Sequence, residues 1–364
     1  MTKIIVDIPG ETAYEVHVAP GALASLPEAV AKAHVGSRVL LVTDSAVDAL
    51  YGEQALQDLK MAGATVSKIV VPSGEDSKSV QVAAEIWDAM ASEHLDRDTA
   101  VVALGGGVTG DLAGFTGSTF MRGLPIVQAP TTLLSMVDSS VGGKTGINLD
   151  AGKNLVGTFC QPRHVCADVD VLSSLPEREW LCGLGEVAKS AAIDSPDFFE
   201  WLEENACALR ARKAETVQEA VVRCITFKAS VVVEDKSETK GVRECLNYGH
   251  TLAHAIEAQA GYGVVSHGAA VAQGMRFAAR LSAALGGASI DFVQRQDALL
   301  DALGLEALSL HADPNRLLEL MMSDKKVRQS RLRFVLPDAP GCWHIQEVDP
   351  RQALEHLDAW QRSL

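Results

Sequence analysis

Long apolar runs, paired cysteines and basic stretches are all missing from this chain of 364 residues. No apolar segment approaches the roughly 20 residues that a membrane-spanning helix needs. The seven cysteines are scattered, odd in number and form no C-x-x-C pair, which is typical of reduced thiols in a cytosol. The first ten residues alternate like a short strand, so we expect no signal peptide. These absences predict a cytoplasmic protein without a membrane partner.

Positive charge is also scarce. The chain has 32 Lys and Arg against 47 Asp and Glu, a formal net charge of -15. Such a chain repels DNA and acidic membranes, so we expect no nucleic-acid partner, and an anionic substrate must be held by locally placed cations. With 47% hydrophobic and 22% charged residues, the composition is globular and the length suffices for two domains.

The first half of the chain alternates short β-branched runs with helical patterns, which is typical of a parallel α/β sheet. An opening β-hairpin is expected around Pro9-Gly10-Glu11, from residues 3–8 and 14–18. The expected strands of the sheet are 38–43, 65–71, 99–104 and 125–129, and the expected helices between them are 45–62 and 78–94. We therefore predict an N-terminal Rossmann-like α/β domain over residues 1–176.

After about Pro176, helical periods dominate the sequence. They are clearest over residues 198–206, 216–232, 246–260, 271–285 and 316–322. Strand-like runs at 332–336 and 343–348 flank Pro337 and Pro340-Gly341, so a small hairpin is expected there. The fold class is thus α/β, with a mostly α-helical second domain over residues 177–364.

A glycine-rich turn follows the strand expected at 99–104. Gly105-Gly106-Gly107-Val108-Thr109-Gly110-Asp111 contains G-x-G-x-x-G and opens a helical stretch, where backbone amides can approach a pyrophosphate. The motif follows a late strand, and a glycine triplet is also an ordinary strand-to-helix turn, so both interpretations stay open. Asp44 ends an earlier strand and could accept hydrogen bonds from a ribose, although turn and capping chemistry explains it equally well.

Three of the ten histidines lie between residues 250 and 267. His250 and His254 share one face of a helix if that helix begins near Gly249, and His267 precedes another helix. Two His with Glu186 and open positions would be typical of a catalytic zinc site. A single histidine near a helix start is more often a cap or a core residue, so the spacing alone does not establish a metal site.

A polar, glycine-rich segment lies where the two halves of the chain meet. Residues 138–146, followed by Lys153-Asn154, combine lysines and an amide with glycines, which suits phosphate binding. A solvated loop with ordinary surface lysines is the alternative.

Over almost the whole chain, these motifs resemble the 3-dehydroquinate synthase family of sugar phosphate cyclases. The matching segments are 105–111, 130–134, 138–146, 185–189, 243–257 and 324–327. The resemblance implies a phosphate-eliminating lyase of the shikimate pathway that converts 3-deoxy-D-arabino-heptulosonate 7-phosphate to 3-dehydroquinate. Its implied steps are transient oxidation by NAD, phosphate elimination, re-reduction and an intramolecular aldol reaction. The alternatives are a related cyclase such as aminodehydroquinate synthase, and a metal-dependent polyol dehydrogenase, which would release NADH.

The resemblance also implies that the domain over residues 1–176 binds NAD, that the domain over residues 177–364 binds metal and substrate, and which residues form the sites. Zinc or cobalt is assigned to Glu186, His250 and His267. NAD is assigned to Asp44, Glu75, Lys78, Gly106, Gly107, Asp111, Thr131, Thr132, Lys144 and Lys153. Catalysis is assigned to Asp138, Lys144, Asn154, Lys189 and His254. Substrate binding is assigned to Arg122, Lys228, Arg243, Asn247 and Lys325, and Arg122 would serve the neighbouring subunit of a homodimer. Ala269 stands where the family often has Glu beside a metal ligand, which would alter how that ligand is oriented.

Overall fold

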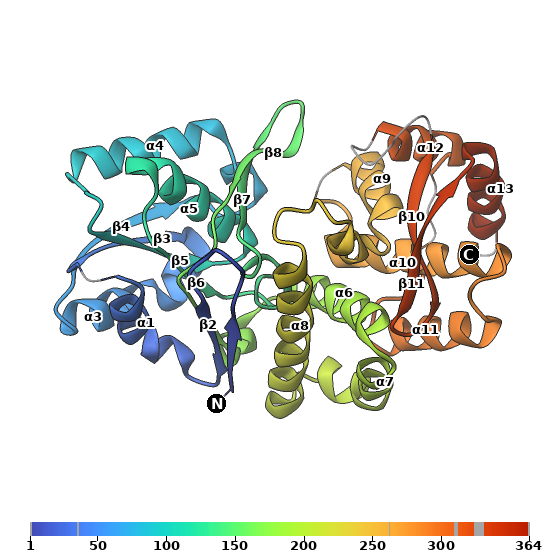
Figure 1. The fold of residues 1–364 in the computed structure, drawn as a ribbon, viewed down its shortest axis with the longest axis horizontal. Coiled ribbons are helices and arrows are strands. Elements are labelled where there is room, and N and C mark those ends of the chain that lie inside the picture. Colours follow the sequence, from blue (N-terminus) through green and yellow to red (C-terminus); the bar gives the residue numbers. More distant parts are fainter. Residues whose placement is uncertain (1, 35, 262, 309–311, 324–330, 363–364) are drawn as a thin grey trace. The chain divides into compact units, whose positions relative to one another are not determined.

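The computed structural model describes residues 2–34, 36–261, 263–308, 312–323 and 331–362, and the chain divides into two compact units (Figure 1). The first unit comprises Met1–Leu175 and Lys228–Ser237. The second comprises Pro176–Phe227 and Glu238–Leu364. This division does not test whether the first domain binds NAD and the second binds metal and substrate, so those roles stay predictions.

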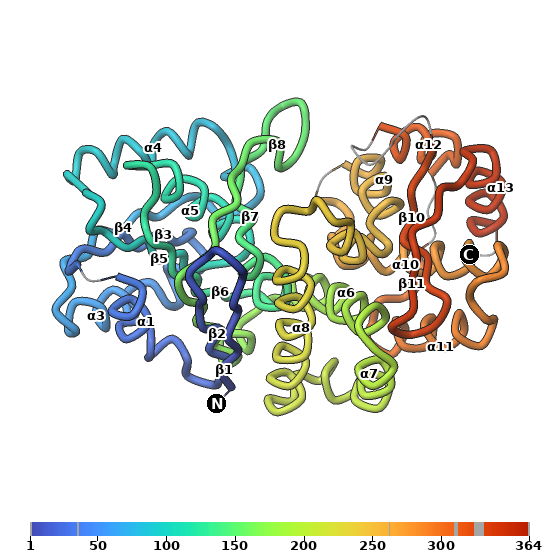
Figure 2. Tube along the Cα trace, in the orientation of Figure 1, coloured from blue at the N-terminus to red at the C-terminus, as the bar shows by residue number. Residues whose placement is uncertain are grey.

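A seven-stranded sheet forms the centre of the first unit. Its order is β1 (Thr2–Val6), β2 (Tyr14–Ala19), β9 (His164–Asp168), β6 (Ile126–Pro130), β5 (Thr99–Gly105), β3 (Arg38–Asp44) and β4 (Thr65–Val71). Only the opening hairpin β1–β2 is antiparallel within this sheet, with Thr2 opposite Val18 (Figure 2). The predicted parallel α/β fold is confirmed.

Helices cover both faces of this sheet. On β3, Val39 and Leu41 pack toward α1 (Leu26–Ala33) and α3 (Glu53–Met61). The alternate residues of β3 pack toward α4 (Val80–Ser92) and α5 (Gly107–Thr119). Successive side chains point to opposite faces, so a strand covered on both sides reads as a continuous apolar run. Because β3, β5 and β6 run parallel, their carboxyl ends lie along one edge of the sheet.

Several segments of the first unit differ from the expectations, and β9 and α1 were not among the predicted elements. The helix expected over 45–62 is divided into α2 (Ser45–Val47), a π-helical turn η2 (Asp48–Gly52) and α3. The polar segment after Asp138 is more ordered than the loop alternative: β7 (Lys144–Leu149) and β8 (Gly152–Phe159) form an antiparallel ribbon. Much of β8 is exposed, so its sequence lacks the apolar alternation that would have predicted a strand.

The second unit is mostly helical, as predicted. Its helices in chain order are α6 (Glu177–Asp194), α7 (Pro196–Arg210), α8 (Ala214–Glu234, whose last residues belong to the first unit), α9 (His250–Ala260), α10 (His267–Ala284), α11 (Ile290–Ala302), α12 (Pro314–Ser323) and α13 (Pro350–Gln361). The predicted small hairpin is present as β10 (Leu332–Ala339) and β11 (Cys342–Val348). The helix expected from residue 246 begins only at His250, because a 3-10 turn, η7 (Val242–Asn247), precedes it.

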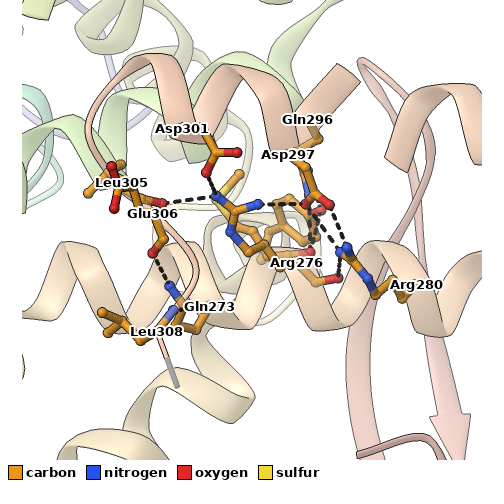
Figure 3. A network of polar contacts seen from close by, with 11 residues as sticks. Gln273, Arg276, Arg280, Gln296, Asp297, Asp301, Leu305, Glu306 and Leu308 are labelled. Carbon is orange, nitrogen blue, oxygen red and sulfur yellow. Dashed lines mark hydrogen bonds and ion pairs between the residues drawn. The ribbon is translucent and has the colours of Figure 1, made fainter. Parts of the chain in front are cut away.

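A buried ion-pair network joins α10 to α11 (Figure 3). The Arg276 side chain is 3% exposed, and its guanidinium contacts Asp297 Oδ1 at 3.0 Å and Asp301 Oδ1 at 2.6 Å. It also donates to the carbonyl of Leu305 at 3.0 Å. A buried guanidinium needs such partners, because desolvation without them would cost several kcal/mol. The network therefore ties α10, which begins at His267, firmly to the rest of its unit.

No helix among the described residues is both long and apolar enough to cross a lipid bilayer.

A histidine in the sheet predicts how stability depends on pH. His164 is 3% exposed, and burial lowers its pKa from 6.5 to about 4, against the opposing influence of Glu15. Lys32, His17 and Lys3 are its other charged or titratable neighbours. Between those two pH values the unfolded chain is protonated at this residue and the folded chain is not. Stability should therefore fall as the pH drops from about 6.5 toward 4.

We expect His164→Asn to remove part of this acid sensitivity. From pH 7 to pH 5, the free energy of unfolding should decrease less in the variant than in the wild type. The two decreases should differ by about 1–2 kcal/mol, a value discounted for solvent screening. Urea unfolding followed by circular dichroism measures the difference. His94→Asn, at an exposed position, is the control. Equal pH dependence in wild type and His164→Asn would contradict the assignment.

Candidate metal centre and nucleotide-binding edge

Three potential metal ligands meet in the second unit. Glu186 lies on α6 and is 1% exposed, His250 begins α9, and His267 begins α10. His250 Nε2 and His267 Nε2 each lie 3.5 Å from Glu186 Oε1. One donor atom from each residue lies within 4.8 Å of the other two. Two imidazole nitrogens and one carboxylate oxygen form a donor set typical of zinc sites that keep an open position.

Glycines beside the ligands let the three helices approach closely. A Cβ on Gly268 would lie 2.1 Å from the carbonyl oxygen of Cys182, so α10 contacts α6 backbone to backbone. A Cβ on Gly274 would lie 1.8 Å from the carbonyl oxygen of Gly249, where α10 meets the start of α9. No larger residue fits at either contact without a shift of the backbone. The convergence of the ligands thus depends on these glycine contacts.

The residues present fit a divalent metal. Glu186 Oε1 is buried and has no hydrogen-bond partner among the described residues, although both histidine Nε2 atoms face it. A buried carboxylate oxygen in that position is unfavourable unless a cation or donor satisfies it. The other oxygen, Oε2, forms an ion pair with Lys189. The unsatisfied oxygen therefore points to where a cation would sit.

The electrostatics of the cluster favour ligand protonation states that suit a metal. Burial alone would raise the pKa of Glu186, but Lys189 and the two histidines outweigh it and hold the pKa well below its usual value. Burial lowers the pKa of His250 well below 6.5. For His267, burial is outweighed by Glu186 and Glu257, which raise its pKa to about 10. A metal would find a charged carboxylate and a neutral His250, and would displace one proton from His267.

Other predicted residues surround this cluster. His254 lies outside it, with ring centroids 5.5 Å from His250 and 6.4 Å from His267. Arg243, on η7, is 3% exposed, and its Nε lies 3.4 Å from Glu238 Oε1. Asn247 ends the same turn. Lys325 is outside the described residues.

The glycine-rich turn lies at the carboxyl edge of the sheet in the first unit. Gly106 is the N-cap residue of α5, and no side chain caps the helix there. A Cβ on Gly106 would lie 3.1 Å from Thr132 Cγ2, so a larger residue would crowd the turn. Thr131 Oγ1, on the adjacent strand end, is buried without a hydrogen-bond partner among the described residues. Free amides at a helix start and an unsatisfied hydroxyl fit the pyrophosphate group of a dinucleotide.

Asp44 caps a helix in this structure. Its Oδ1 accepts hydrogen bonds from Ala46 N at 3.0 Å and Val47 N at 3.2 Å, and from Ser73 Oγ at 2.6 Å. Its Oδ2 accepts from Thr109 Oγ1 at 3.2 Å. The contacts from Ser73 and Thr109 were not expected from the sequence, because both residues looked like ordinary turn residues. They hold the carboxylate at the edge of the sheet.

Two lysines of the first unit form short polar contacts. Lys78 Nζ contacts Asp111 Oδ2 at 2.7 Å and Asn154 Oδ1 at 2.6 Å. Lys228 Nζ contacts Asp138 Oδ1 at 2.5 Å and the carbonyl oxygen of the same residue at 2.6 Å. Burial raises the pKa of Asp111, and Lys78 opposes that rise. The structure thus brings five of the predicted residues of this unit into direct contact, and a carboxylate balances each ammonium group.

The remaining predicted residues of the first unit lie around these pairs. Glu75 Oε1 accepts a hydrogen bond from Asn148 Nδ2 at 2.8 Å. Lys144 begins β7, and Lys153 lies on β8. Arg122 is exposed in a turn with a left-handed backbone, φ 70°.

One contact at the metal cluster was missed by sequence reasoning. Glu257 Oε2 lies 3.2 Å from His267 Nδ1. The available signal was spacing, because Glu257 follows His250 by seven residues, about two helical turns, and so lies on the same face of α9.

Models of known families match most of the chain. The model for the 3-dehydroquinate synthase N-terminal region matches residues 68–182, and the model for the C-terminal region matches residues 183–327. A 3-dehydroquinate synthase of Rhodopirellula baltica is 48% identical over 312 residues, 86% of this chain and 83% of that protein. A 3-dehydroquinate synthase of Pelobacter propionicus is 45% identical over 345 residues, 95% of this chain and 96% of the relative.

Solved structures with the same fold include two cyclases. A 2-deoxy-scyllo-inosose synthase complexed with carbaglucose-6-phosphate, NAD+ and Co2+ has a TM-score of 0.89 and 26% identity, covering 98% of this chain and 99% of that chain. A 2-epi-5-epi-valiolone synthase of Streptomyces hygroscopicus with NAD+ and Zn2+ bound has a TM-score of 0.88 and 27% identity, with the same coverage. The family models and the identities over most of its length show that the chain belongs to the 3-dehydroquinate synthase family.

Proposed function

We propose that this chain is a 3-dehydroquinate synthase, which uses NAD and zinc or cobalt to convert 3-deoxy-D-arabino-heptulosonate 7-phosphate into 3-dehydroquinate and phosphate. One observation carries the proposal: a Glu-His-His cluster in a chain 45–48% identical to proteins of that name. The cyclases with other products are only 26–27% identical, so they are the less favoured alternative. Those two structures hold NAD+ with Co2+ or Zn2+, which supports the cofactors proposed here.

In the second unit, Glu186, His250 and His267 would hold the metal. When bound, the metal supplies Lewis-acid stabilisation of a substrate oxygen, and NAD supplies a hydride acceptor. Lys189 pairs with Glu186 and keeps that carboxylate charged. His254 is close to the ligands but outside their cluster, so its ring can donate to or accept from a substrate oxygen. Arg243 is the proposed partner of the substrate carboxylate, together with Asn247 and Lys325 as further substrate contacts.

In the first unit, the amides after Gly106 and Gly107 would hold the pyrophosphate of NAD, and Asp44 the ribose. The further residues proposed for NAD are Glu75, Lys78, Asp111, Thr131, Thr132, Lys144 and Lys153. Lys144 and Asn154 would stabilise negative charge on a phosphate group. Lys228 and Asp138 form a charge-assisted pair at 2.5 Å. This pair would hold the ammonium group of Lys228 in a fixed position for contact with the substrate.

We also propose a cytoplasmic homodimer that acts in the shikimate pathway. Arg122 is the residue proposed to act across the dimer: it is exposed, and both it and Met121 have left-handed backbones, a conformation that few non-glycine residues adopt. A guanidinium presented on such a turn suits a phosphate group held by a neighbouring copy of the chain.

The metal assignment predicts the behaviour of His267→Ala. Loss of one of three ligands should remove bound zinc and activity, while the far-UV circular dichroism spectrum stays close to that of the wild type. Metal content per chain, measured by atomic emission after gel filtration, tests this. His356→Ala on α13 is the control and should keep its zinc. Full zinc occupancy in His267→Ala would exclude that residue as a ligand.

The closed redox cycle predicts a stoichiometry. Turnover of 3-deoxy-D-arabino-heptulosonate 7-phosphate should release phosphate continuously with no net accumulation of NADH, because the hydride returns to the same substrate molecule. A phosphate assay run beside NADH absorbance measures both. NADH growing in proportion to substrate consumed would favour the polyol dehydrogenase alternative.

The carboxylate assignment predicts the effect of Arg243→Lys. A lysine cannot reproduce two parallel hydrogen bonds, so kcat/KM should fall by roughly ten- to a hundredfold, about 1.5–3 kcal/mol. Zinc content should not change. Arg316→Lys, in an exposed ion pair with Glu319, is the matched control. With a substrate analogue that lacks the carboxylate, Arg243→Lys should lower kcat/KM little further. An equal loss of kcat/KM for both substrates would mean that Arg243 has a structural role.

A further inference from the structure

The two histidines of the metal cluster are held from behind by different acceptors. His250 Nδ1 lies 3.1 Å from the carbonyl oxygen of Tyr248, a neutral group of its own chain segment. His267 Nδ1 lies 3.2 Å from Glu257 Oε2, a carboxylate on another helix. In both rings the opposite nitrogen, Nε2, faces Glu186 Oε1 at 3.5 Å. Each ring therefore has one nitrogen for the cluster and one for its own acceptor.

We propose that Glu257 is a positioning residue for the metal centre: it accepts the Nδ1 proton of His267, fixes that ring and raises its affinity for a divalent metal. This inference deepens the proposed function and rests on its metal site. A carboxylate behind a ligating histidine keeps the proton on the far nitrogen and makes the near one more basic. His267 gains more from such a partner than His250 does from a neutral carbonyl.

The packing of α9 against α10 brings the two residues together. Glu257 lies on α9, and His267 is the first residue of α10. The contact of Gly249 with Gly274 holds the two helices at a short distance. The Glu257 side chain is 10% exposed, against 29% for His267, so the carboxylate is the more buried of the pair. A buried carboxylate keeps its position only if its partners are fixed, which favours a rigid pair.

The exposure of the His267 side chain adds to the need for this contact. His250 and His267 both begin their helices, so neither backbone has a preceding helical turn to restrain it, and the two differ in exposure. The His267 side chain is more exposed than that of His250, 29% against 12%. The ring of His267 therefore depends on a side-chain partner for its orientation more than the ring of His250 does.

Zinc affinity of the purified chain, stripped of metal, tests the proposal. Competition with a chromophoric chelator gives the Kd for Zn2+, and the Co2+ absorption spectrum reports the geometry of the site. We expect Glu257→Ala to raise the Kd about 10- to 100-fold and to shift the Co2+ bands. Glu257→Gln keeps an oxygen acceptor without its charge, so its Kd should lie between those of Glu257→Ala and the wild type.

Glu203→Gln is the matched control, because Glu203 is an ion-paired carboxylate of the same unit, bound to Arg295. Its Kd and Co2+ spectrum should equal those of the wild type. The melting temperature without metal is measured for every variant. A lower melting temperature in either Glu257 variant with an unchanged Kd would mean that Glu257 only ties α9 to α10, and would overturn the proposal.

The design separates this proposal from the proposed function. A wild-type chain that binds zinc but does not release phosphate from the sugar acid phosphate would contradict the function and leave the role of Glu257 standing. A Kd for Glu257→Ala within twofold of the wild-type value would overturn the role of Glu257 even in a fully active enzyme.

Discussion

The unsatisfied oxygen of Glu186 is the constraint on which the second unit depends. A buried carboxylate oxygen without a donor is unfavourable, and here two imidazole nitrogens face it at equal distance. Lys189 neutralises the other oxygen of the same group. A metal cation would satisfy all three ligand atoms at once after displacing the proton of His267, because a carboxylate oxygen and two imidazole lone pairs then all accept. The donor set and the charges around it therefore fit a divalent metal.

Close helix packing and a buried ion pair maintain this arrangement. Gly268 lies directly against α6, and Gly274 lies directly against the turn before His250, so α10 contacts both of the helices that carry the other ligands. Farther along α10, Arg276 is bound to Asp297 on α11, as Figure 3 shows. A helix fixed along its length holds its first residue, His267, in place. Rigid elements of this kind are what a preorganised metal site needs.

Most strands of the sheet in the first unit could be predicted from the sequence, because they read as apolar or β-branched runs, but β9, although buried throughout, was missed. Strand β5 is buried throughout and reads as an apolar run between turn signals. The ribbon of β7 and β8 could not be predicted, because its second strand is exposed and glycine-rich and has no apolar face. The start of α10 was expected near residue 271 rather than 267, because Gly268-Ala269-Ala270 has no helical period. Small residues that allow close packing obscured the helix start.

The candidate site could be predicted as a set of residues only through the family resemblance. Spacing suggested that His250 and His254 share a face, yet the potential ligands that meet are His250 and His267, and their meeting with Glu186 depends on helix packing. Anomalous X-ray scattering at the zinc absorption edge, from crystals of the zinc-loaded protein, is the most direct test of the metal centre. We predict one strong peak per chain, about 2.0–2.2 Å from Glu186 and from both histidine Nε2 atoms. A peak bound by other residues, or none at this cluster, would contradict the account.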